Sequence, residues 1–289
     1  MYLDNIDTLY RIMESCTLCP RNCRVNRLKG EEGFCGVPVD PVISSYGPHF
    51  GEEPPLVGSR GSGTIFMAGC NLGCIFCQNY DISHLRRGNR ISVAKLAEIM
   101  LTIQDGGCHN INFVTPTHFT APIMDAARIA RERGLEVPLV YNCGGYESLE
   151  ILRLLEGGIE IYMPDAKYWD EAVAKELSSA PDYPLAMRNA LREMHRQVGI
   201  LTMDRRGVAV RGLLIRHLVM PEGLAGTCNI MEFIARELSP DSYVNVMAQY
   251  RPMFKGVEHP KIGRALNSLE YREAVQLARE AGLYRGFPE

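Results

Sequence analysis

The sequence has no apolar stretch long enough to span a membrane, and its purely hydrophobic runs are short. The N-terminal residues lack the basic segment followed by an apolar one that marks a secretory signal. Charge of either sign is not in excess, since the net charge is −3 over 289 residues, and the one short basic run spans 86–90. These absences predict a soluble cytoplasmic protein with no membrane and no nucleic-acid partner.

Cysteine is what the sequence does have, with ten in all. Three of them are scattered, whereas seven fall into two short segments. Closely spaced cysteines in a chain without an export signal indicate metal ligands rather than disulfides. The two clusters consist of Cys16, Cys19, Cys23 and Cys35, and of Cys70, Cys74 and Cys77.

From residue 64 onward, short apolar runs alternate with segments that have apolar residues at helical spacing, most of which end at glycine. This alternation predicts an α/β fold with a parallel sheet covered by helices. Six units favour a partial (β/α)₆ TIM-like barrel, with an open doubly wound sheet as the alternative. The predicted strands are 64–68, 111–114, 138–141, 159–163, 212–220 and 243–247.

The chain before this pattern differs, because it is rich in cysteine and turn-forming residues and shows little periodicity. Residues 51–63 are rich in glycine and proline and predict a connecting loop. We therefore expect a small Cys-rich metal-binding segment at 1–55 and a barrel at 56–289. In such a fold the active site lies at the carboxyl ends of the strands.

The second cluster follows the first predicted strand directly, in the order Cys70-x₃-Cys74-x₂-Cys77. Cubane iron–sulfur clusters are normally held by four thiolates, so three leave one iron open. A structural zinc site would need a fourth ligand, and the nearest candidate, His84, lies seven residues further on. The spacing and position favour a catalytic [4Fe–4S] cluster over zinc or simply buried cysteines.

The segment CNLGCIFCQN resembles the signature of the radical S-adenosylmethionine (SAM) superfamily, with Phe76 as its aromatic residue. The whole chain resembles the subfamily named for its likeness to pyruvate formate-lyase activating enzyme. That resemblance extends through CTLCPRNCRVNR, GFCG, EEPPLVGSRGSGTIF, FVTPTHFT, VYNCGGYE, YMPDAKYW, IRHLVMP and MAQYRP. It implies a [4Fe–4S] cluster, SAM, a radical SAM barrel, and an electron donor such as flavodoxin or ferredoxin.

Polar residues follow the predicted strands where SAM would bind. Asn142 follows the third strand and resembles part of the Thr-Asn-Gly of the activases. Asp165 and Lys167 follow the fourth strand and resemble the Asp-x-Lys of the activases. The second strand is followed by a Thr-Pro-Thr-His segment, where the activases carry Gly-Gly-Glu. The expected cofactor-binding residues are Phe76, Thr115, Thr117, His118, Asn142, Asp165, Lys167, Arg216 and Gln249.

Several of these residues have a second interpretation. His118 can be an ordinary turn histidine, and Asp165 with Lys167 can be a solvated surface pair. Arg216 lies in an apolar strand and needs an anionic partner, which is either the SAM carboxylate or Asp165. Cys143, at the same edge, is expected to be a small buried residue rather than a redox group.

The four N-terminal cysteines form a complete set of ligands, which predicts a closed site that stabilises a segment with little core of its own. Zinc and an auxiliary iron–sulfur cluster both suit four thiolates, and we favour zinc. Reduced thiols without a metal are the remaining alternative.

The function predicted from these features is an oxidoreductase that cleaves SAM reductively and abstracts hydrogen from a substrate. The substrate is a glycyl-radical enzyme if the protein is an activase, or else a peptide or small molecule. The alternative from another class is an iron–sulfur electron-transfer protein, which would need no polar residues at the strand ends. A classical SAM methyltransferase would need a glycine-rich turn where the cysteines lie.

Overall fold

The computed structural model describes residues 5–287. A nine-stranded sheet has the order β3-β1-β2-β4-β5-β6-β8-β7, and β9 pairs with β8. Six of its strands run parallel, in the order β2, β4, β5, β6, β8 and β9. The sheet continues beyond β2 through antiparallel β1 instead of returning to β9, so the barrel is not closed. The predicted α/β class and partial barrel are confirmed.

All six predicted strands are present, with ends that differ by a few residues. The parallel strands are β2 (Ser62–Met67), β4 (Ile111–Val114), β5 (Leu139–Cys143), β6 (Ile161–Pro164), β8 (Ala209–Leu218) and β9 (Tyr243–Met247). The periodicity did not predict β1 (Val42–His49), β3 (Asn89–Arg90) or β7 (Thr202–Met203). These three pair antiparallel at the margins of the sheet, where alternating exposure weakens the apolar signal.

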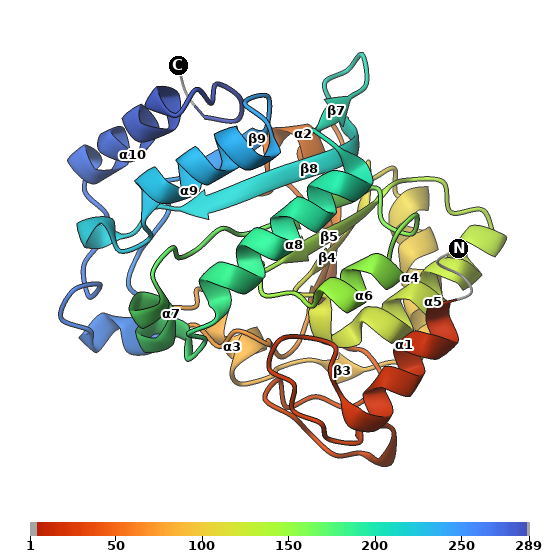
Figure 1. The fold of residues 1–289 in the computed structure, drawn as a ribbon. Coiled ribbons are helices and arrows are strands. Elements are labelled where there is room, and N and C mark those ends of the chain that lie inside the picture. Colours follow the sequence, from red (N-terminus) through yellow and green to blue (C-terminus); the bar gives the residue numbers. More distant parts are fainter. Residues whose placement is uncertain (1–4, 288–289) are drawn as a thin grey trace.

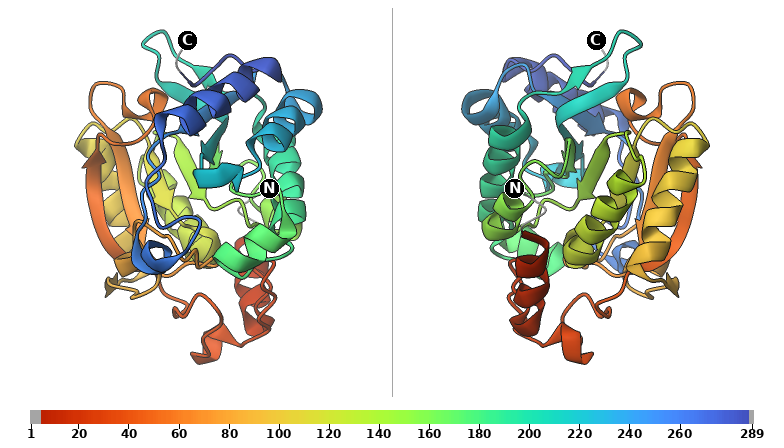
Figure 2. Two further views of the ribbon diagram at one scale, coloured as in Figure 1. Left: turned by 90° about the vertical axis from the view of Figure 1, so that its left-hand side faces the viewer. Right: turned by 90° about the vertical axis from the view of Figure 1, so that its right-hand side faces the viewer.

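Helices cover the outer face of the curved sheet (Figure 1, Figure 2). The longer ones are α4 (Val93–Asp105), α5 (Thr120–Glu132), α8 (Tyr183–Val198) and α10 (Ser268–Glu280). Ser92 caps α4, where its side chain accepts a hydrogen bond from the Lys95 amide. The shorter helices are α1 (Ile6–Ile12), α2 (Pro54–Val57), α3 (Tyr80–Ser83), α6 (Leu149–Leu154), α7 (Glu171–Ser178) and α9 (Thr227–Phe233).

Single turns complete the list of elements. The 3₁₀ turns are η2 (Met13–Ser15), η3 (Arg27–Lys29), η4 (Thr117–Phe119), η5 (Pro221–Gly223) and η7 (Phe254–Glu258), and η6 (Ile234–Leu238) is a π turn that continues α9. The segment predicted as a loop at 51–63 contains α2 and the start of β2, so it is not wholly irregular.

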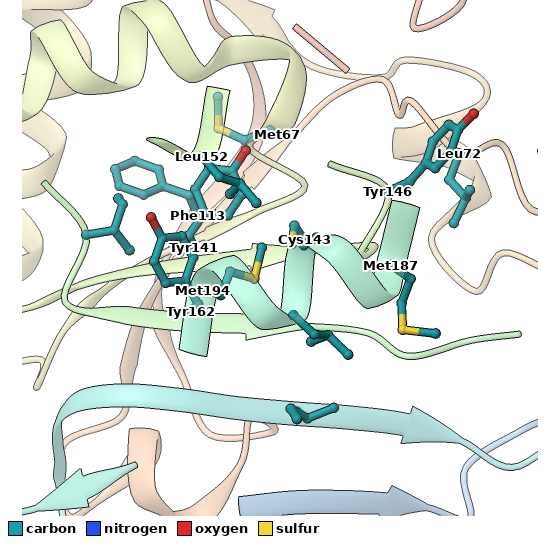
Figure 3. Close-up of a cluster of buried hydrophobic side chains, with 14 of the residues drawn as sticks. Met67, Leu72, Phe113, Tyr141, Cys143, Tyr146, Leu152, Tyr162, Met187 and Met194 are labelled. Atoms are coloured by element: carbon teal, nitrogen blue, oxygen red, sulfur yellow. The ribbon is translucent and has the colours of Figure 1, made fainter. Parts of the chain in front are cut away.

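The core lies between the sheet and its helices. Tyr141 and Tyr162 meet edge to face, with ring centroids 5.8 Å apart, and Figure 3 shows Phe113 and Met194 beside them. All four side chains are buried. Burying aromatic and aliphatic side chains of this size contributes about 1.5–3 kcal/mol each. This packing fixes the strands in one register, and the register in turn fixes which residues emerge together at the carboxyl edge.

The N-terminal segment packs below the sheet, next to the loop that follows β2 (Figure 1, Figure 2). Helix α1 contacts α5, and its Leu9 is fully buried. The boundary predicted near residue 55 therefore separates two parts of the sequence that pack against each other.

Candidate functional site

A cavity of about 210 Å³ opens at the carboxyl edge of the sheet. Five of the six parallel strands contribute residues to its lining, and β6 is followed directly by Asp165, which also lines it. The strand ends meet here because they lie at one level in the register. Of the predicted residues, the cavity is lined by Cys70, Cys74, Cys77, Phe76, Thr115, Asn142, Asp165, Lys167, Arg216 and Gln249.

The three cysteines come from the loop after β2, which turns sharply at two glycines in left-handed conformation. A side chain at Gly69, where φ is +81°, would meet Val37 at 2.6 Å and the Cys35 carbonyl at 2.9 Å. All three cysteines line the same cavity. Three sulfur ligands beside an open space suit an iron–sulfur cluster that keeps one position free.

Each of these thiols receives a hydrogen bond. The Leu72 amide donates to Cys70 Sγ at 3.3 Å, the Ser83 hydroxyl donates to Cys77 Sγ at 3.1 Å, and the Ser178 hydroxyl donates to Cys74 Sγ at 3.1 Å. Burial raises the pKa of the Cys70 thiol to about 12. A thiol with so high a pKa binds a metal only when the metal displaces its proton, which is released to solvent. Hydrogen-bond donors at the sulfur favour the resulting thiolate.

Asp165 is the centre of an ionic network on the opposite wall. Arg216 Nε donates to its Oδ1 at 2.8 Å, and Lys167 Nζ donates to its Oδ2 at 2.5 Å. A second guanidinium nitrogen, Nη2, donates to Asn142 Oδ1 at 2.7 Å. A parallel bridge between Asp165 and Arg216 in the sheet brings these side chains together. Of the two predicted partners of Arg216, the structure contains Asp165.

Asp165 is buried, with 7 % of the whole residue exposed. Burial alone would raise its pKa, but Arg216 and Lys167 hold that pKa below its ordinary value. Burial acts in the opposite direction on Lys167, yet Asp165 keeps the pKa of the ammonium raised. The group therefore carries one negative and two positive charges, and it is not the solvated surface pair of the alternative interpretation.

Three further predicted residues line the cavity in different ways. Phe76 is buried against Tyr168 and Tyr250, with ring centroids 6.4 and 5.7 Å away. Thr115 has φ +60°, a left-handed conformation that turns the chain away after β4, and its amide donates to the Asn142 carbonyl at 2.8 Å. Gln249 is exposed, and its carbonyl accepts a hydrogen bond from the Gln78 side chain at 3.0 Å.

Two residues expected in the SAM pocket, Thr117 and His118, do not line this cavity. The left-handed turn at Thr115 directs them to the other side of the loop, where both are buried in η4. Thr117 donates to the buried carboxylate of Glu147 at 2.8 Å. His118 Nε2 lies 2.8 Å from the Ala68 carbonyl, and burial lowers the pKa of its imidazole to about 3. The prediction placed them wrongly.

His118 lines a second, smaller cavity of about 20 Å³ instead. The same cavity is lined by all four N-terminal cysteines, together with Arg27 and Asn71. Within residues 5–287, no group of three or more His, Cys, Asp or Glu side chains is arranged around a point that could hold a single metal ion. The chain nevertheless gathers the four predicted ligands in one place.

Burial and charge act together on these N-terminal thiols. Burial raises the pKa of Cys35, and the Arg27 guanidinium is the strongest influence that lowers it. The pKa of Cys19 is also raised by burial. A small space lined by four thiols suits a metal that displaces their protons.

Arg21 connects the two cavities. Its guanidinium donates to the carbonyls of Asn71 at 2.8 Å and Leu72 at 2.9 Å, within the catalytic-type cysteine loop. It also donates to the carbonyls of Ser178 at 2.9 Å and Ser179 at 2.5 Å. Asn71 lines the second cavity, while its neighbours Cys70 and Leu72 line the first. One peptide segment thus separates the two sites.

Sequence reasoning missed Glu147, Ser178 and Tyr183. The Tyr183 hydroxyl accepts from the Lys167 amide at 3.0 Å and lies 2.8 Å from the Asp165 carbonyl, so it holds the loop after β6. Glu147 belongs to the segment VYNCGGYE, and a lone acidic residue beside two glycines was its only signal. Ser178 and Tyr183 carried none, since their partners lie far away in the sequence. Cys143 lines the main cavity as a buried thiol, as expected.

No helix among residues 5–287 has the length and apolarity needed to span a membrane.

Comparison with known proteins agrees with this geometry. The family model described as the radical SAM superfamily matches residues 64–203. The uncharacterized protein MJ0674 of Methanocaldococcus jannaschii is 32% identical over 289 residues, which cover 96% of this chain and 78% of that protein.

Two solved structures are similar in fold. HydG, a maturase of the [FeFe]-hydrogenase, aligns with a TM-score of 0.50 at 14% identity over 76% of this chain. Methylornithine synthase (PylB) aligns with a TM-score of 0.48 at 16% identity, also over 76% of this chain. The chain spans 49% of the first structure and 63% of the second. The cysteine loop, the partial barrel and the family match lead to one conclusion: the chain belongs to the radical SAM superfamily.

Proposed function

We propose that this radical SAM enzyme binds SAM in the 210 Å³ cavity and uses it to abstract hydrogen from a substrate at the cavity mouth. The observation that carries the proposal is that Cys70, Cys74 and Cys77 line the same cavity as the network around Asp165. An electron-transfer protein has no need of such a wall of fixed charges beside its cluster.

The three cysteines would hold a [4Fe–4S] cluster with one iron open toward the cavity. When bound, the cluster supplies the electron that splits the sulfonium bond of SAM and yields a 5′-deoxyadenosyl radical. The chain's own task is to bind, orient and shield the reactants. Phe76 and Leu218 give the cavity apolar walls, which keep water away from a radical.

The network would bind the charged end of SAM. Arg216 uses Nε and Nη2 in its bonds to Asp165 and Asn142, which leaves Nη1 for a carboxylate. Lys167 is a second cation in the lining, and the side chain of Asn142 adds an amide. Asp165 holds both cations in place, and Glu53, 4.0 Å from Arg216 Nε, is a second carboxylate next to the guanidinium. Thr115 and Gln249 lie at the rim, where they would contact the rest of the cofactor or the substrate.

The substrate proposal rests on the resemblance described above. We propose a glycyl-radical-enzyme activase, in which the hydrogen comes from a glycine of a partner protein; a peptide or small molecule is the competing substrate. An electron donor such as flavodoxin or ferredoxin would reduce the cluster. The exposed position of Gln249 at the cavity mouth supports a substrate that approaches from outside.

We also propose that the four N-terminal cysteines hold a metal, either zinc or a second iron–sulfur cluster. Their convergence on one cavity supports this proposal. The site would be closed, because the protein fills every ligand position.

Reductive SAM cleavage tests the main proposal. The anaerobically reconstituted protein, given SAM and dithionite, should release 5′-deoxyadenosine. Cys74→Ala should lose both the absorbance of the cluster and all cleavage, because only two thiolates remain in the cavity. Cys228→Ala is the matched control, since Cys228 is exposed and lies outside both cavities. Near wild-type cleavage by the Cys74 variant would contradict the assignment. Deuterium moving from a labelled candidate substrate into 5′-deoxyadenosine identifies the substrate.

A further inference from the structure

Arg27 is a fully buried guanidinium, with 0 % of its surface exposed. Its Nη1 donates to the His118 carbonyl at 2.5 Å, and its Nη2 donates to the Pro38 carbonyl at 2.6 Å. Its Nε has no hydrogen-bond partner. Within residues 5–287, no carboxylate forms an ion pair with it. Carbonyl oxygens satisfy two of its donors but do not neutralise its charge.

A buried, unpaired cation is strongly unfavourable, because removal from water costs several kcal/mol per ion unless an opposite charge lies nearby. The ring of Phe119, 5.9 Å from the guanidinium carbon, offers only a weak cation–π contact. The other neighbours of Arg27 are the residues of the small cavity, among them Cys35 and Cys19. The four cysteines are the groups in its lining that can become anions.

We propose that Arg27 is the internal counter-ion of a metal–thiolate centre formed by Cys16, Cys19, Cys23 and Cys35. The proposal rests on the second metal site proposed above and adds the residue that balances its charge. Four thiolates around a divalent ion, or around an oxidised [4Fe–4S] cluster, leave an excess negative charge. The unpartnered Nε–H is a donor that a thiolate sulfur or a bridging sulfide can accept.

Two other side chains in the lining also have buried polar atoms without partners. His118 is 2 % exposed and has an unpartnered Nδ1, and Asn71 is 1 % exposed and has an unpartnered Oδ1. Together with Arg27 Nε, three buried polar atoms without partners therefore belong to residues around one cavity of about 20 Å³. Arg27 Nε is the hydrogen-bond donor among them. His118 Nε2 faces the Ala68 carbonyl and so carries the ring proton, which leaves His118 Nδ1, like Asn71 Oδ1, an acceptor. A thiolate or sulfide would therefore satisfy Arg27 Nε, and the case for the centre rests on that donor and its buried charge.

The test separates a counter-ion from a residue that merely bridges two carbonyls. Arg27→Met removes the charge and the donors, whereas Arg27→Lys keeps the charge. Arg24→Met is the matched control, because Arg24 neighbours Cys23 but its side chain is exposed. Each variant is measured with its metal and after removal of the metal by a chelator. The readouts are metal content by elemental analysis, metal affinity by chelator competition, and Tm.

A counter-ion predicts at least a tenfold loss of metal affinity in Arg27→Met, since a buried charge has lost its partner, with a smaller loss in Arg27→Lys and none in Arg24→Met. It also predicts that Arg27→Met lowers the Tm of the metal-loaded protein more than the Tm of the stripped protein. Equal shifts in both states would overturn the proposal, because a carbonyl bridge acts with or without metal.

Two further outcomes are decisive. If the wild-type protein binds no metal beyond the iron held by Cys70, Cys74 and Cys77, the proposed N-terminal metal centre does not exist. Metal content, metal affinity and Tm are also measured in the Cys74→Ala background, where only the cluster of Cys70, Cys74 and Cys77 is lost. A missing N-terminal metal can then be told apart from a failure of the proposed SAM cleavage. If the Cys74→Ala protein keeps the N-terminal metal, and if the affinity for that metal still depends on Arg27, the proposal is supported even if SAM cleavage is never observed.

Discussion

Replacing Asp165 by Asn tests the network at the cavity directly. The change keeps the size of the side chain but removes the one negative charge between Arg216 and Lys167. The side chain of Asp165 is 11 % exposed and those of its partners are 18 % and 15 % exposed, so water screens these charges poorly. Removing one member of a buried ionic group leaves the others unpaired and costs about 3–5 kcal/mol.

At this chain length, 1 kcal/mol corresponds to roughly 2 °C in Tm, so we expect Asp165→Asn to lower Tm by roughly 6–10 °C. Glu98→Gln is the control, because it removes a carboxylate from the solvent-exposed pair with Lys95. That variant should melt at the wild-type temperature. Calorimetry of both variants, each with its cluster reconstituted, measures the shifts.

The pH dependence of the unfolding free energy shows whether the charge of Asp165 stabilises the fold. Because the folded pKa of Asp165 is depressed, its charge stabilises the fold above the unfolded pKa of about 3.9, and that contribution is lost as pH falls through the lower folded value. The difference in unfolding free energy between wild type and Asp165→Asn should therefore be constant above about pH 5 and shrink in more acidic solution. A difference that is absent at pH 7, or that grows toward low pH, would refute the assigned role.

Two more predictions follow from the other buried groups. Replacing Cys16 and Cys19 by Ser should lower Tm and loosen roughly the first fifty residues, because in a segment with little core the free energy of metal binding supplies the free energy of folding. SAM cleavage driven by dithionite should persist. Unchanged Tm and metal content would contradict this prediction. Glu147 accepts hydrogen bonds from Thr117 and Tyr141, and burial raises its pKa to about 7. Because the carboxyl pKa is raised in the folded state, the folded protein loses stability as pH rises from about 5 to about 7. In Glu147→Gln the free energy of unfolding, measured with urea, should therefore change less with pH over that window. The same pH dependence in the variant as in wild type would contradict this role of Glu147.

The sequence predicted the sheet well, because parallel strands buried on both faces leave a strong apolar pattern. Thr115, Asn142, Asp165 and Arg216 were placed at one edge for the same reason, since strand ends share one level in a parallel register. The pairing of Asp165 with Arg216 was one of two stated alternatives. Only the register shows that these two residues are neighbours, and the SAM carboxylate stays a proposed second partner of Arg216.

The errors arose where a single backbone angle or a distant contact decides the outcome. After the positive φ of Thr115, His118 lies at the N-terminal cavity and not at the main one, and a threonine gives no warning of that conformation. Arg27 seemed an ordinary basic residue because its partners, the carbonyls of Pro38 and His118, are backbone atoms. Backbone acceptors have no sequence signature.

Arg21 has a consequence for the order in which the protein assembles. Its partners Ser178 and Ser179 lie 157 and 158 residues further along the chain. During synthesis the N-terminal cysteines leave the ribosome first, but the acceptors that hold Arg21 follow only after more than half of the chain has been made. Contacts so distant in sequence form late in folding. The thiols of the N-terminal segment are therefore open to cellular metals and oxidants longer than those of the loop that Arg21 finally secures.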